Sequence, residues 1–155
     1  MKFGDVITAV ASLAVIYILL AFACMAVFVP VDPYWGIDVA NILAILVASL
    51  IVGYVFAAKI QEGSRMGAIG RIVVLFAVVQ MFGFMASMAV NPYMGAMMEE
   101  GLESMFSTSG WATTDWLGYS HFVLIMMAAV NVVFALVFGF IGLYVGARLR
   151  KSSKS

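Results

Sequence analysis

Four runs of apolar residues, each long enough to cross a lipid bilayer, constrain this chain more than any other feature. They cover residues 5–29, 38–58, 72–89 and 116–147. A transmembrane helix needs about 20 mainly apolar residues, and the chain is 65% hydrophobic and only 10% charged. Backbone groups in lipid must bond within their own segment, so the runs are expected to be helices. The sequence therefore predicts an all-α integral membrane protein, a four transmembrane helix bundle forming one domain over residues 1–155.

The charged residues divide between the two sides of such a chain. All eight basic residues fall on one side, as Lys2, Lys59, Arg65, Arg71, Arg148, Arg150, Lys151 and Lys154. Six of the eight acids fall on the other side, as Asp32, Asp38, Glu99, Glu100, Glu103 and Asp115. Basic loops stay in the cytoplasm, so we expect a multi-pass protein of the cell membrane with both termini cytoplasmic. Basic residues spread over three segments form no dedicated patch, so no nucleic-acid partner is expected.

Two pairs of segments are similar, which suggests an internal repeat. Residues 31–36 and 90–95 both carry a Pro-Tyr turn after an apolar run, 59 positions apart. Proline cannot continue a helix, and tyrosine is enriched at the membrane–water boundary. The second and fourth runs match at a spacing of 90 positions, which aligns Asn41 with Asn131. Two tandem helical hairpins related by an axis along the membrane normal explain both spacings. Chance similarity between apolar helices is the alternative.

The loop between the third and fourth runs, residues 90–115, is predicted to lie outside with a short amphipathic helix over residues 94–106. Four apolar residues recur there at helical spacing, namely Met94, Met98, Leu102 and Met105. The opposite side carries three acids, Glu99, Glu100 and Glu103. We interpret these acids as a solvated face, with a Ca²⁺ site as the alternative because Ca²⁺ takes several oxygen ligands. The loop is also the expected contact for a membrane-protein partner.

Few polar residues lie within the runs, and no Asp, Glu, Lys or Arg lies well inside them. Three are amides, Gln80 in the third run, Asn41 in the second and Asn131 in the fourth. Such amides either bond across helix contacts or line a small cavity that holds a ligand headgroup, and we favour the first interpretation. Small residues share a face with two of the amides, which predicts close helix packing at Gly139, Gly142, Gly146, Gly83 and Ser87.

Little in the sequence indicates catalysis. One cysteine, Cys24, and one histidine, His121, make no disulfide, nucleophile–base pair or metal site. The buried charge that ion-coupled transporters use is also missing. We therefore expect no cofactor and a non-enzymatic protein, either an accessory subunit or a self-assembling bundle with the lipid bilayer as its surroundings. The alternative is a small-molecule or lipid carrier or channel with a polar site near Gln80 and Asn131.

Overall fold

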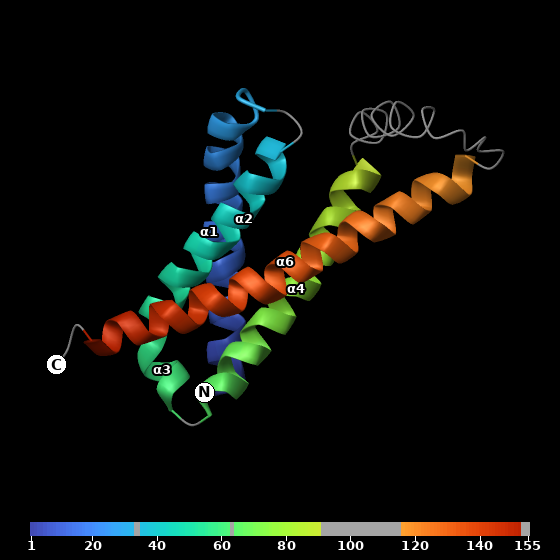
Figure 1. Cartoon of the computed structure of the whole chain (residues 1–155). Coiled ribbons are helices and arrows are strands. Elements are labelled where there is room, and N and C mark those ends of the chain that lie inside the picture. Colours follow the sequence, from blue (N-terminus) through green and yellow to red (C-terminus); the bar gives the residue numbers. More distant parts are fainter. Residues whose placement is uncertain (33–34, 63, 91–115, 153–155) are drawn as a thin grey trace.

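Five helices make up the part of the chain that the computed structural model describes, residues 1–32, 35–62, 64–90 and 116–152 (Figure 1). They are α1 Phe3–Phe28, α2 Trp35–Val55, α3 Ala57–Gln61, α4 Arg65–Val90 and α6 Trp116–Ser152. Four of them contain stretches long and apolar enough to cross a membrane, Phe3–Phe28, Gly36–Val55, Arg65–Gly83 and Ala128–Arg150. The prediction of an all-helical chain with four such helices is confirmed. The predicted outer helix over residues 94–106 lies outside the described residues.

The helices differ from the predicted runs at the loop that joins the second and third. The second run was expected to continue to residue 58, but α2 ends at Val55 because Phe56 leaves helical geometry, with φ −90° and ψ 8°. The short helix α3 follows. The third helix begins before its apolar run, at Arg65, because Ser64 caps it: the Gly67 N–H donates to Ser64 Oγ at 3.2 Å. Helix geometry here extends past the apolar residues that predicted it.

The four long helices contact one another in pairs that run in opposite directions (Figure 1), and we call each such pair of successive helices a hairpin. α1 pairs with α2, and α4 pairs with α6. The hairpins join through two further contacts, α2 with α6 and α1 with α4, and the helices in each of these pairs run in the same direction (Figure 1). The contact between α2 and α6 is the most extensive in the bundle, and the contact between α1 and α4 is the slightest of the four. α6 crosses obliquely over both α2 and α4 (Figure 1).

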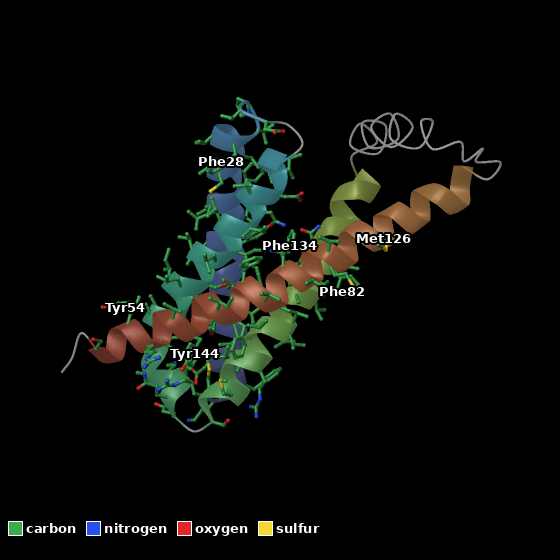
Figure 2. The ribbon with its side chains drawn as sticks, viewed as in Figure 1. Phe28, Tyr54, Phe82, Met126, Phe134 and Tyr144 are labelled. Carbon is green, nitrogen blue, oxygen red and sulfur yellow. The ribbon has the colours of Figure 1, made fainter. Side chains whose placement is uncertain are left out.

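Apolar side chains fill the space between the four long helices. The largest fully buried ones include Phe76, Leu13, Ile45, Ile60, Ile69, Ile72 and Leu143. Large apolar side chains also project outward along the helices (Figure 2), and Phe22 is 71% exposed. Soluble monomers rarely expose wide apolar patches. An outer surface of this kind suits contact with lipid acyl chains.

α2 and α6 approach so closely that only glycine fits at several positions. A Cβ atom added to Gly142 would lie 2.6 Å from the carbonyl oxygen of Leu46 and 2.6 Å from Ser49 Cβ. One added to Gly146 would collide with the Leu50 carbonyl oxygen. Small residues of this kind let helix backbones approach, and in lipid the resulting dispersion contact holds helices together. The α2–α6 contact is therefore the tight seam of the bundle.

Residues at constant sequence spacing meet across the two parallel contacts. Asn41 bonds to Asn131, 90 positions away. At the same spacing, Gly53 lies against the backbone of Leu143. Across the α1–α4 contact, Tyr17 packs edge-on against Phe76, 59 positions away, with ring centroids 5.7 Å apart. Both spacings are those at which the sequence is similar to itself.

The start of α1 and the end of α6 lie toward the same end of the bundle as α3 (Figure 1). The N-terminal ammonium group donates to the carbonyl oxygen of Glu62 at 3.1 Å, and Lys59 forms an ion pair with Asp5. The start of α1 is thereby tied to the loop before α4. We call this end, which holds Lys2, Lys59, Arg65, Arg71, Arg148 and Arg150, the basic end.

The last turns of α6 are tied to the same end by side chains that reach backbone carbonyls. Arg150 Nη1 donates to the carbonyl oxygen of Val55 at 2.6 Å and to that of Tyr54 at 3.3 Å. The guanidinium also lies 6.0 Å from the centre of the Tyr54 ring. Carbonyls at a helix C-terminus have no partner within the helix, so Arg150 caps α2 from the neighbouring hairpin.

Candidate functional site

A cluster of polar side chains lies inside the bundle, between apolar layers. The Tyr17 hydroxyl of α1 donates to Asn41 Oδ1 of α2 at 2.7 Å. Asn41 Nδ2 in turn donates to Asn131 Oδ1 of α6 at 2.6 Å. Asn41 is only 7% exposed. Burying an amide or hydroxyl without a hydrogen-bond partner costs free energy. These hydrogen bonds give partners to polar groups that would otherwise have none in the apolar interior.

Gln80 of α4 reaches the same cluster. Its side chain lies beside the Tyr17 hydroxyl, but the two groups do not meet in a hydrogen bond of normal geometry. Gln80 Nε2 is buried and has no hydrogen-bond partner among the described residues. Each of the four long helices thus contributes one polar side chain, and we call Tyr17, Asn41, Gln80 and Asn131 the polar cluster. The sequence prediction named three of its members, and the structure brings those three together.

The chemistry of the polar cluster is limited to hydrogen bonding. Its groups are one phenol and three carboxamides, which are neutral near pH 7 and both donate and accept. Such groups orient a neutral polar partner, but they supply neither a general base nor a strong nucleophile. Within the described ranges, no group of three His, Cys, Asp or Glu side chains is placed to hold a metal ion. The cluster is suited to holding helices or to holding a small uncharged group.

Ser49 is a second buried polar residue on α2, closer to the basic end. It is fully buried, and its Oγ has no partner in the part of the chain that the structure describes. It faces Gly139 of α6, where an added Cβ would lie 3.7 Å from Ser49 Oγ. A serine here keeps the side chain small at the seam, and its hydroxyl contributes no bond between the helices.

The face of the fourth run that carries Asn131 and the glycines predicted to pack closely turns toward the bundle. Asn131 is half-buried, and Ala135, Gly139, Gly142 and Gly146 are buried. Gly142 and Gly146 lie directly against the backbone of α2. The glycines of this face therefore contact another helix of the same chain.

Close packing at Gly83 and Ser87 in the third run stays a prediction. Gly83 is exposed, and a Cβ added to it would meet no described atom within 4 Å. The end of α4 and the start of α6 spread apart in this view (Figure 1). Ser87 lies further along α4, at a position whose side chain is outside the description, as is that of His121 in α6. The three glutamates of the outer segment also lie outside it.

Sequence reasoning missed Tyr17 as a member of the cluster. A signal was present, because a tyrosine in the middle of an apolar run has a hydroxyl that must find a partner away from water. Gly53 was missed as well as a residue of close helix contact. A Cβ added to it would lie 2.5 Å from the Leu143 carbonyl oxygen. Its partner helix is distant in the sequence, so spacing within the second run alone did not reveal it.

Comparison with known proteins gives no relative from which a function could be inferred, so the function is inferred from the geometry of the bundle and its polar cluster. No family model matches the chain, and no curated protein or solved structure gave a match.

Proposed function

We propose that this chain is a non-enzymatic membrane protein that serves as an accessory subunit of a membrane assembly. The observation that carries the proposal is the hydrogen-bonded chain from Tyr17 through Asn41 to Asn131. Its members bond to one another across three helices, so the polar residues of the interior are used to hold the bundle. Interhelical hydrogen bonds of this kind contribute about 0.6 kcal/mol each on average and up to about 1.7 kcal/mol.

A self-assembling bundle is the less favoured form of this proposal. The residues best suited to close helix contact, Gly142 and Gly146, already pack against α2 of the same chain. Self-association would have to use another face. An accessory subunit needs only a stable bundle and an exposed surface for its partner. Its expected partners are the lipid bilayer and another membrane protein.

The test is purification from the native membrane in mild detergent, followed by mass spectrometry of the intact complex. An accessory subunit should be recovered with a second membrane protein at fixed stoichiometry. Recovery as a monomer, or as a complex of identical chains, would refute the accessory role. A control purification in harsh detergent should separate the partner and leave the four-helix chain folded.

The proposed orientation has both termini and the basic end in the cytoplasm, because basic segments are retained there. It is tested by cysteine labelling from outside intact cells, in a Cys24→Ala background. A cysteine at Val31, which is 82% exposed at the opposite end from α3, should react with a membrane-impermeant reagent. A cysteine at Ser64, exposed at the basic end, should not react. Labelling of the cysteine at Ser64 alone would show that the protein has the opposite orientation.

We also propose that the two hairpins arose by duplication of one hairpin. Support comes from the two sequence spacings, because the residues that they relate meet at the centre of the bundle: Asn41 with Asn131, and Tyr17 with Phe76. Residues related by a two-fold axis contact each other where they lie next to that axis. The rotation that superposes α1–α2 on α4–α6 should be close to a half turn about the bundle axis. A rotation far from a half turn would contradict the duplication.

A second candidate function is a carrier or channel that binds a small polar molecule near Gln80 and Asn131. Its support is Gln80 Nε2, a buried donor without a described partner. The variant Gln80→Leu separates the candidates. If Gln80 only fills space, the variant should be as stable as the wild type and should retain its partner protein. If the residue binds a ligand, a small polar molecule should be recovered with the wild type and lost from the variant.

A further inference from the structure

We propose that the groove between α1 and α4 at the basic end binds an anionic phospholipid. Its phosphate would contact Arg71, and one acyl chain would lie along the groove. The groove is an open cleft of about 390 Å³ lined by Phe3, Val6, Gly70, Arg71, Val74 and Leu75. It lies at one end of the bundle, away from the polar cluster. The inference does not depend on the accessory role.

The walls of the groove suit an acyl chain. All of its lining residues except Arg71 are apolar or glycine, and Phe3 is 74% exposed and Val74 55% exposed. α1 and α4 make the slightest contact of the four main helix pairs. Space remains at Gly70, where an added Cβ would meet no described atom within 4 Å. Burial of apolar surface favours filling such a space with a chain of CH₂ groups.

Arg71 supplies the charge that selects the headgroup. It is the one charged residue among those lining the groove, and it is exposed. Among the residues that the structure describes, none forms an ion pair with it. The guanidinium fork matches a phosphate with two parallel hydrogen bonds. Basic pockets between transmembrane helices on the cytoplasmic side commonly bind anionic headgroups.

The size of the groove favours a lipid over a protein partner. Clefts of about 300–1,000 Å³ hold small molecules, whereas a stable protein interface buries about 800 Å² on each partner. Ionic attraction at the membrane surface is worth about 1 kcal/mol per basic residue, or about fivefold in affinity. An anionic phospholipid should therefore bind more tightly than a zwitterionic one with the same chains.

The test uses the full chain purified in mild detergent, with bound lipid counted by native mass spectrometry. The probes are phosphatidylglycerol and phosphatidylcholine with identical acyl chains. The wild type should prefer phosphatidylglycerol, and Arg71→Gln should lower phosphatidylglycerol binding about fivefold. Phosphatidylcholine binding should fall by less, because its phosphate is offset by the choline cation, so the preference for phosphatidylglycerol should shrink. The matched control is Arg65→Gln, which removes a charge from the same helix and the same end but not from the groove. It should bind both lipids as the wild type does.

A second variant tests the acyl-chain part of the site. Gly70→Leu places a side chain in open space, so the variant should keep the melting temperature of the wild type and lose binding of both lipids. Three results would each overturn the proposal. One is undiminished phosphatidylglycerol binding by Arg71→Gln, and another is an equal loss in Arg65→Gln. The third is wild-type binding of both lipids by a Gly70→Leu variant of unchanged melting temperature.

Discussion

Replacing Gly142 by leucine should destabilise the bundle more than the same replacement elsewhere in a membrane-spanning helix. The new Cβ would lie 2.6 Å from the Leu46 carbonyl oxygen and 3.0 Å from the Leu50 backbone nitrogen. Backbone atoms cannot rotate away, so α6 must move off α2. Overpacking of this kind costs up to about 3 kcal/mol. The shift also lengthens the 2.6 Å bond between Asn41 and Asn131, whose loss adds about 1 kcal/mol.

The expected loss for Gly142→Leu is therefore about 4 kcal/mol in the free energy of unfolding. It is measured by equilibrium unfolding of the purified chain in mixed micelles of mild and denaturing detergent. The matched control is Gly83→Leu, because a Cβ added to that glycine would meet no described atom within 4 Å. The control should stay within about 1 kcal/mol of the wild type. Equal losses in the two variants would refute the reasoning, because they would mean that the α2–α6 seam tolerates a side chain.

Two further variants probe the hydrogen bonds that join the helices. Tyr17→Phe should lower the free energy of unfolding by about 1 kcal/mol, because Asn41 Oδ1 loses its donor; an unchanged unfolding curve would show that the hydroxyl bond is not stabilising. Arg150→Gln should uncap the carbonyls of Tyr54 and Val55 and speed hydrogen exchange at the end of α2, with a stability loss under about 1 kcal/mol. Unchanged exchange there would show that Arg150 does not cap α2.

The number and approximate positions of the long helices were predictable because each depends on local composition. Lipid admits only structures whose backbone bonds are internal, so an apolar run of the right length has few alternatives. The end of α2 at Val55 and the start of α4 at Arg65 were less predictable. They depend on a local change of backbone angles and on a serine cap rather than on apolarity.

The polar cluster was predicted in part for a related reason. Asn41, Gln80 and Asn131 stand out because amides in apolar runs need partners, but which partner each finds depends on how the hairpins pack. Close packing at Gly83 stays a prediction, because a small-residue stripe shows that a helix can be approached closely, and not that a neighbour is there. Gly142 and Gly83 look alike in the sequence, but a Cβ added to Gly142 would meet α2, whereas one added to Gly83 would meet no described atom within 4 Å.

The central claim is that the polar cluster holds the two hairpins together, and a double-mutant cycle on Asn41 and Asn131 tests it most directly. The cycle compares Asn41→Leu, Asn131→Leu and the double variant by unfolding in mixed micelles. The 2.6 Å bond between the two side chains predicts that each single variant loses about 1–2 kcal/mol. It also predicts that the double variant loses less than the sum, with a coupling energy of about 1 kcal/mol. Strictly additive losses, or single variants as stable as the wild type, would contradict the claim.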